Sequence, residues 1–339
     1  MTPLGTVTHA TRTRSWKVLE IAVRFVRKIG TSKMEKFTLF LLMPGVALAV
    51  CDPKFEQVGE KCLRFETEFR MTFAEAHEVC ISEHGATLAV IDSAQHFKDI
   101  VDHIHSKEDL KESFWIDGMD VGHDGHWTTR EGENFPMGTP FWAGFPDYQE
   151  PSGGTKENCA HMSNGQRFYI NDIDCNSAYW FICEQANNYE KSNKNVSTSD
   201  SPCPFHYVRV GSKCLSFLNQ YELPWNEASL QCGYLDPKGE LAFVNDIELL
   251  RAIFLHLEEE WMTDHHYWIG GTDEGHEGNW TWTDGSAVPM GTPFWGLYNG
   301  GQEPAGGSTE NYLFLSNRDF YFRDNIGSTL LTPLCQMIE

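Results

Sequence analysis

The sequence predicts an α+β protein built from two tandem copies of one disulfide-stapled domain. The 339 residues are enough for about two domains, and the 10 cysteines form an even number. Helix-type and strand-type apolar patterns occur in both halves of the chain. Four cysteines recur at the same intervals in both halves: Cys51, Cys62, Cys80 and Cys183 match Cys203, Cys214, Cys232 and Cys335. A repeat this long indicates tandem domains rather than a solenoid.

Short motifs repeat in the same order within the two halves. The shared motifs are WIDG at 115–118 and WIGG at 268–271, PMGTPFW at 136–142 and 289–295, and QEP at 149–151 and 302–304. These matches place the first domain, copy one, at residues 50–184 and the second, copy two, at residues 203–339. The stretch between them, 185–202, is rich in Asn, Ser, Thr and Lys and is typical of a flexible linker. It carries a glycosylation sequon at Asn195.

Copy one begins with a helix–strand–helix pattern. Thr72 and Glu75 form a capping box before a helix that ends near Gly85, and residues 86–91 read as a buried strand. A second helix follows, because its apolar residues repeat with helical spacing. These residues are Phe97, Ile100, Val101 and Ile104.

Copy two follows the same plan. Pro224 suits the start of a helix, and residues 241–244 read as the strand. The stripe of its second helix consists of Leu249, Leu250, Ile253, Phe254 and Leu257. Each copy then continues with short strands and a Gly/Pro-rich loop of about 30 residues, a length that is usually functional or needs a staple.

The N-terminal residues precede both copies. Residues 34–49 have a charged start, a short apolar run and the small-x-small sequence Ala47-Leu48-Ala49, which predicts a secretory signal peptide. Residues 1–33 form an upstream basic segment with three interpretations: an over-extended start with Met34 as the initiator, a targeting or membrane-surface helix, or a long n-region. The first interpretation excludes this segment from the mature protein. We therefore expect a secreted, extracellular protein.

The composition limits the classes of partner that this protein is expected to bind. The formal net charge is −22, which disfavours binding to nucleic acids and anionic lipids. No second apolar segment is long enough to span a membrane. Regularly spaced cysteines favour an oxidising compartment. The sequence leaves the oligomeric state open and allows a homo-oligomer.

The two copies differ in one cysteine pair. Copy one has Cys159 and Cys175 where copy two has Tyr312 and Gly327, so these two cysteines are expected to bond to each other. The other expected pairs are Cys51–Cys62 and Cys203–Cys214, which close N-terminal hairpins, and Cys80–Cys183 and Cys232–Cys335, which join the first helix to the last strand. No thiol then remains for catalysis, and no nucleophile motif occurs. We expect no enzymatic activity.

The stretch 149–175 of copy one concentrates hard oxygen donors. Calcium takes six to eight oxygen ligands, several of them carboxylates. The candidate ligands are Glu150, Ser152, Glu157, Asn171 and Asp172. This stretch therefore predicts a calcium site.

The cysteine spacing, the WIGG and Glu-Pro motifs, Glu157-Asn158-Cys159 and the Asn171-Asp172 pair resemble the C-type lectin-like domain in its long form. The resemblance covers nearly all of both copies, and the tandem arrangement resembles invertebrate lectins of innate immunity. It implies two helices, two small antiparallel sheets and a calcium-binding long loop in each copy. It also implies Ca²⁺ as the cofactor and glycans, including microbial surface sugars, as partners.

The resemblance assigns the roles in copy one. Glu150, Ser152, Glu157, Asn171 and Asp172 would hold both calcium and sugar, and the peptide before Pro151 is expected to be cis. Two adjacent sugar hydroxyls would ligate the ion and accept or donate charge-assisted hydrogen bonds. The leading Glu favours a mannose-type sugar. Ser152 stands where the family has Asn, so weaker affinity is expected.

The matching positions of copy two depart further. Glu303, Glu310 and Asp324 remain, but Ala305 has no side-chain donor and Arg323 replaces Asn. Because Arg cannot ligate a metal and would repel one, copy two is expected to have lost this site. Copy two also has a sequon at Asn279, where strand burial could block modification.

An auxiliary calcium site occurs in some family members. Its matching positions are Asp120 and Asp124 with Glu157 in copy one, and Asp273 and Glu277 with Glu310 in copy two. The alternative is an acidic loop that is simply solvated. For the whole chain, the alternative to a calcium-dependent lectin is a calcium-independent module that binds protein.

Overall fold

The computed structural model describes residues 51–185 and 202–338. The upstream segment 1–33, the signal peptide 34–49 and most of the linker, including Asn195, lie outside the described residues. The described parts of both copies belong to one compact unit.

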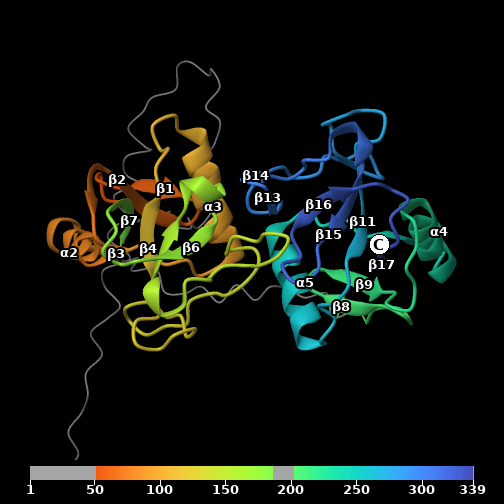
Figure 1. The fold of residues 1–339 in the computed structure, drawn as a ribbon, viewed down its shortest axis with the longest axis horizontal. Helices are drawn as coiled ribbons and strands as arrows, with labels where there is room; N and C mark the ends of the chain where they lie inside the picture. Colours follow the sequence, from red (N-terminus) through yellow and green to blue (C-terminus); the bar gives the residue numbers. More distant parts are fainter. Residues whose placement is uncertain (1–50, 186–201, 339) are drawn as a thin grey trace, which may run out of the picture. The chain divides into compact units, whose positions relative to one another are not determined.

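Copy one is a mixed sheet with two helices (Figure 1). Its strands follow the order β1-β2-β7-β4-β5-β6, and β3 pairs with β7. The parallel pairing of β4 with β7 joins what are otherwise antiparallel strands into one sheet. The elements are β1 (Glu56–Val58), β2 (Lys61–Met71), α2 (Phe73–His84), β3 (Ala86–Leu88), α3 (Ala94–Ser106), β4 (Phe114–Met119), β5 (Cys159–Met162), β6 (Ile170–Ile173) and β7 (Tyr179–Gln185), with short 3₁₀ turns η1 (Gly154–Lys156) and η2 (Asn164–Gln166).

Copy two repeats this topology in the order β16-β15-β11-β17-β9-β8, with β10 on β17 and β12 on β11. Its elements are β8 (Val208–Val210), β9 (Lys213–Phe217), α4 (Trp225–Leu235), β10 (Gly239–Leu241), α5 (Ile247–Glu259), β11 (Tyr267–Thr272), β12 (Thr281–Trp282), β13 (Leu297–Tyr298), β14 (Gly301–Gln302), η3 (Gly307–Thr309), β15 (Tyr312–Leu315), β16 (Phe322–Asn325) and β17 (Thr332–Met337). The α+β fold class and the tandem repeat are confirmed.

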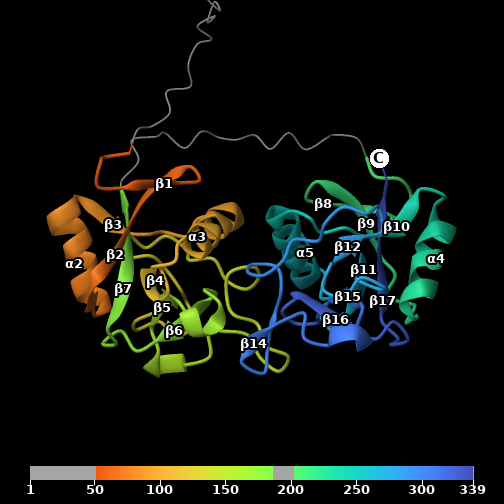
Figure 2. The same cartoon turned by 90° about the horizontal axis from the view of Figure 1, so that it is seen from above.

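Local sequence signals place the helix ends. The Thr72 hydroxyl accepts from Glu75 N, and the Glu75 carboxylate accepts from Thr72 N, so the expected capping box is present. Gly85 ends α2 with a left-handed φ of 61°. Pro224 caps the start of α4. The helix α2 packs against β2, β3 and β7 (Figure 2), and the apolar stripes of α3 and α5 are buried as expected.

The two predicted strands after the first helices are shorter than expected. Residues 86–91 form a strand only to Leu88, and the strand expected at 241–244 ends at Leu241. The reason is that the following residue bridges two strands instead of extending one ladder. In copy one, Ala89 N donates to Ile182 O while Ala89 O accepts from Asp117 N.

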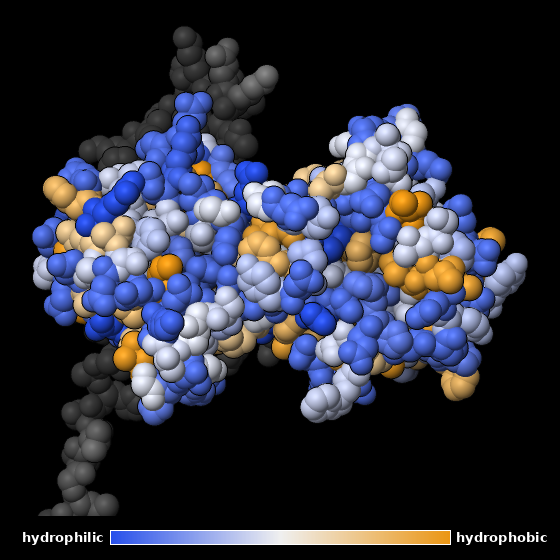
Figure 3. Space-filling model, viewed as in Figure 1, coloured by the Kyte–Doolittle hydropathy of each residue, from blue (hydrophilic) through white to orange (hydrophobic). Residues whose placement is uncertain are grey.

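The structure contains five disulfides with the expected pairing: Cys51–Cys62, Cys80–Cys183, Cys159–Cys175, Cys203–Cys214 and Cys232–Cys335. Asn279 is exposed just before β12, so burial does not block this sequon. The face drawn in Figure 3 is mostly hydrophilic with scattered apolar residues, as the acidic composition suggests.

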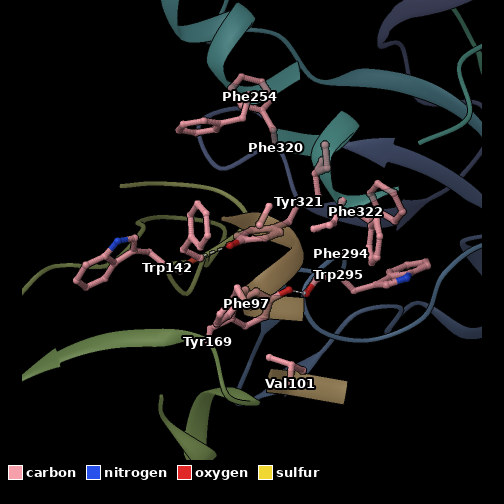
Figure 4. Packing of buried hydrophobic residues seen from close by; sticks show 14 of the residues in the cluster. Phe97, Val101, Trp142, Tyr169, Phe254, Phe294, Trp295, Phe320, Tyr321 and Phe322 are labelled. Atoms are coloured by element: carbon pink, nitrogen blue, oxygen red, sulfur yellow. Dashed lines mark hydrogen bonds between the residues drawn. The ribbon is translucent and has the colours of Figure 1, made fainter. Parts of the chain in front are cut away.

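One aromatic-rich core runs through both copies. At its centre the rings of Tyr169 and Tyr321 lie 5.0 Å apart. The Tyr169 hydroxyl donates to Trp295 O at 2.7 Å, and the Tyr321 hydroxyl donates to Trp142 O at 2.6 Å (Figure 4). Because these residues occupy matching positions, the inter-copy interface has an approximate two-fold symmetry.

Further contacts of the inter-copy interface come from the repeated PMGTPFW motif. The Thr139 hydroxyl donates to Asp319 O, and its counterpart Thr292 donates to Arg167 O. Arg251 on α5 donates to the carbonyls of Met137 and Thr139 at 2.7 and 2.6 Å. The motif that is identical in both copies thus holds them together.

Candidate functional site

The candidate site of copy one lies where the long loop returns to the sheet. The peptide Glu150–Pro151 is cis, as expected. The Cys159–Cys175 disulfide joins the start of β5 to the residues after β6. Strand pairing of Ala160 with Asp172 then brings the end of the loop and the Asn171-Asp172 pair side by side.

Asp172 on β6 holds the turn at Ser152 and Gly153 in place. Its side chain is buried, and its two carboxylate oxygens accept from Ser152 N at 3.1 Å and Gly153 N at 2.7 Å. These bonds hold the backbone of the Glu-Pro-Ser turn against β6.

Glu150 is the second buried carboxylate, only 7% exposed. Its Oε1 accepts from Gln166 Nε2 at 3.3 Å, whereas Oε2 is buried and has no partner among the described residues. Burial, and then the nearby charge of Asp172, raise the pKa of Glu150. An orphaned oxygen beside a second carboxylate is a suitable place for a cation.

The other expected ligands differ in position. Glu157 follows the turn η1, and burial and the charges of Asp172 and Asp174 raise its pKa. A side chain at Gly153 would lie 2.2 Å from Glu157 Oε2, so glycine is required here. Ser152 is exposed, and the Asn171 amide donates to the Asp172 carbonyl at 2.6 Å.

The structure therefore brings Glu150, Ser152 and Asp172 together, with Glu157 beside them. Within 51–185 and 202–338, no three His, Cys, Asp or Glu side chains are placed to hold a metal by themselves. A calcium site here would also need the neutral donors Ser152 and Asn171. The orphaned Glu150 oxygen fits such an ion.

The auxiliary positions are only partly assembled. Asp120 is buried, its Oδ2 accepts from Gly125 N at 2.8 Å, and its Oδ1 has no partner among the described residues. Asp273 repeats this arrangement with Gly278 N in copy two. Asp124 and Glu277 are exposed, and burial, followed by the charge of Asp124, raises the pKa of Asp120. The loops that carry Asp120 and Asp273 are each held by a hydrogen bond from a backbone N–H to the aspartate.

In copy two, Glu303, Glu310, Arg323 and Asp324 line one cavity of about 590 Å³. Asp324 repeats the role of Asp172, because it accepts from Ala305 N and Gly306 N at 3.1 and 2.9 Å. Burial, and then the charge of Asp324, raise the pKa of Glu303 to about 8. Copy two therefore keeps the carboxylates that match the expected calcium ligands, but it lacks the neutral donors that Ser152 and Asn171 provide in copy one.

The sequence did not point to Gln166 or Asp319. Gln166 lies in the turn η2, and only the hairpin of β5 and β6 brings it to Glu150. Asp319 forms a buried ion pair with Arg323 at 2.6 Å. A signal existed for this pair: copy one has Arg167 and Asn171 at the matching positions, so both charges change together between the copies.

The helices of the described residues include none that is both long and apolar enough to cross a membrane.

Comparisons with known proteins find matches in both copies of the chain. The family model described as Lectin C-type domain matches residues 69–185 and 221–336. C-type mannose receptor 2 of Homo sapiens is 21% identical over 243 residues, covering 69% of this chain and 15% of the receptor. The galactose-specific lectin nattectin of Thalassophryne nattereri is 30% identical over 86 residues, covering 25% of this chain and 52% of that protein.

A similar solved structure is the mouse scavenger receptor C-type lectin carbohydrate-recognition domain, at 23% identity with a TM-score of 0.33. It covers 40% of this chain and 98% of that chain. The chain spans about half or less of the length of the two curated relatives. The family consists of non-enzymatic binding domains, which confirms the expectation that this chain is not an enzyme. Two matched segments, each on one copy, show that the chain belongs to the C-type lectin domain family as a tandem pair.

Proposed function

We propose that copy one binds carbohydrate in a calcium-dependent manner and that the protein is secreted to recognise glycans on microbial or other cell surfaces. The observation that carries this proposal is the buried Glu150 Oε2, which has no partner among the described residues and lies beside Asp172. The same residues, with Ser152, Glu157 and Asn171, would hold the ion. Asp120 and Asp124 would contribute only to an auxiliary ion.

A bound calcium ion supplies coordination positions for two adjacent sugar hydroxyls. Glu150 would accept a hydrogen bond from one of these hydroxyls, and the Asn171 amide would donate to it. Glu150 and Ser152 flank Pro151 in the same turn. The Asp172 bonds to Ser152 N and Gly153 N keep that turn in place before any ligand arrives, which reduces the entropy lost on binding.

The leading Glu of the turn supports a proposal for the class of sugar. We propose a mannose-type preference, because a Glu at position 150 resembles that pattern. One relative is named a galactose-specific lectin, so a galactose preference is the alternative. A calcium-independent protein-binding role is the second candidate, because copy two lacks side-chain donors at Ala305 and carries Arg323.

The test uses the full chain on a glycan array and in thermal melting, with calcium and with EGTA. We expect Glu150→Gln to abolish calcium-dependent glycan binding and the rise in melting temperature that calcium causes. Ser152→Asn is expected to strengthen calcium-dependent glycan binding by about tenfold, because an amide replaces a hydroxyl, and to enlarge the calcium-induced rise in melting temperature by a few degrees. Glu303→Gln in copy two is the matched control and should leave both unchanged. Glycan binding that persists in EGTA and in Glu150→Gln would contradict the proposal.

A further inference from the structure

Arg323 is the cationic residue at the centre of the copy-two site. Its side chain is buried, 5% exposed, on strand β16. Nη2 donates to Asp319 Oδ2 at 2.6 Å, and Nη1 donates to Leu297 O at 2.9 Å. Nη1 also lies 3.7 Å from Glu303 Oε1. The guanidinium therefore contacts the first carboxylate of the expected calcium set.

A glycine beside Arg323 leaves room for its guanidinium. A Cβ on Gly296 would lie 2.8 Å from Arg323 Nη2, so a larger residue would collide with the guanidinium. Copy one has Ala143 at the matching position, opposite Asn171. The copy that carries the arginine is also the copy that carries the glycine.

A second glycine makes room from the other side of the inter-copy interface. A Cβ on Gly144 would lie 2.6 Å from Asp319 Oδ2, whereas copy two has Leu297 at the matching position. Nη2 of Arg323 also reaches Gly144 O at 3.5 Å. The ion pair of Asp319 and Arg323 is thus built into both the copy-two site and the contact with copy one.

The positive charge of Arg323 determines whether the copy-two site can also hold a metal ion. Asp319 is 1% exposed, and a buried carboxylate is costly unless it is paired. The Arg323 guanidinium pairs with Asp319 and lies 3.7 Å from Glu303, so a divalent cation at Glu303 would face a fixed positive charge a few ångströms away. Such like charges repel strongly in a buried site. The copy-two residues therefore do not fit calcium.

We propose that Arg323 takes the place of the metal ion in copy two, as a permanent cation that orders the loop without calcium. This inference does not depend on the proposed function of copy one. It assigns Glu303, Asp319 and Asp324 to a metal-free loop that keeps its shape in the presence of chelators.

The test is a double-mutant cycle in the full chain, in which the melting temperature of each variant is measured in EGTA. Gly296→Ala should lower the melting temperature by about 5 °C, because its methyl group meets the guanidinium. In the Arg323→Asn background, the same Gly296→Ala change completes the residue pair of copy one, Ala143 with Asn171, and should cost less than about 1 °C. Ala143→Gly in copy one is the matched control, since no arginine lies opposite. Equal penalties in both backgrounds would overturn the proposal.

Calcium supplies a second readout. Arg323→Asn should melt several degrees below the wild type in EGTA, because Asp319 loses its partner. Its calcium-induced rise in melting temperature should exceed that of the wild type, because the repelling charge is gone. Glu303→Gln should reduce this rise in Arg323→Asn and leave it unchanged in the wild type. A reduction in the wild type would show that copy two binds calcium beside Arg323 and would overturn the proposal.

Discussion

Buried carboxylates are the residues with the most unusual environments in this protein. Burial raises the pKa of Asp117 to about 6 and that of Glu303 to about 8, and it raises the pKa of Glu150 and Asp120 as well. Asp117 lies outside the candidate site, in the WIDG motif on β4, and copy two has Gly270 at the matching position. Its Oδ1 accepts from Arg130 N, while Oδ2 is buried without a partner among the described residues.

Asp117 predicts a pH dependence of stability. Its folded pKa of about 6 exceeds the reference value of 3.8, so the folded state holds a proton that the unfolded state releases between these values. Stability from this group therefore falls as pH rises from about 4 to 6. Asp117→Asn should stabilise the protein at pH 7 by roughly 2–3 kcal/mol and leave it unchanged near pH 3. Melting at both pH values checks this, and the exposed Asp109→Asn is the control. A variant that is less stable at pH 7 would disprove it.

At the scale of elements, the two copies close the β5–β6 and β15–β16 hairpins by different means. Copy one uses the Cys159–Cys175 disulfide. In copy two, the Tyr312 ring lies over Gly327, where a Cβ would be only 2.5 Å from the ring, and packs against Trp225 at 4.9 Å. Aromatic packing thus occupies the place of the covalent link.

The contribution of the disulfide, and how far aromatic packing can replace it, can be measured in copy one. The disulfide spans a sequence separation of 16 residues. Removing it with Cys159→Ser and Cys175→Ser should cost roughly 3 kcal/mol of unfolding free energy, as expected for a loop of this length. Cys159→Tyr with Cys175→Gly, the copy-two residues, should cost less because the ring regains packing. Chemical denaturation compares the two variants. Equal losses would show that the ring does not replace the staple.

At the scale of the molecule, the inter-copy interface couples the two copies through a pair of tyrosines. Trp295 O accepts from Gln302 Nε2 as well as from Tyr169, whereas Tyr321 is the sole donor to Trp142 O among the described residues. The approximate symmetry is therefore broken in hydrogen bonding. A buried carbonyl that loses its only donor is more costly than one that keeps a second.

We expect Tyr321→Phe to lower the free energy of unfolding by more than Tyr169→Phe does. We expect roughly 1–3 kcal/mol for the former and about 1 kcal/mol or less for the latter, measured by calorimetry of the full chain. Both variants should still unfold in one transition, since the packed core spans the copies. Tyr179→Phe, a ring stacked on His161 within copy one, is the control. Two separate transitions in the wild type would contradict the coupling.

Much of the fold followed from local signals in the sequence. The capping box at Thr72, the stripe of α5 and the Cys159–Cys175 pair depend on spacing or on the comparison of two copies, which a sequence displays directly. The strand expected at 86–91 was too long because an apolar run does not reveal where a backbone leaves one ladder for another.

The acidic donors of the candidate site were also evident from the sequence, since calcium-type ligands cluster in one stretch. What only the tertiary structure decided is their surroundings. The free oxygen of Glu150, the ion pair of Arg323 with Asp319 and the room left by Gly144 depend on residues that are far apart in the chain. Burial and close contact set the energy of a charge, and both arise only when distant segments pack together.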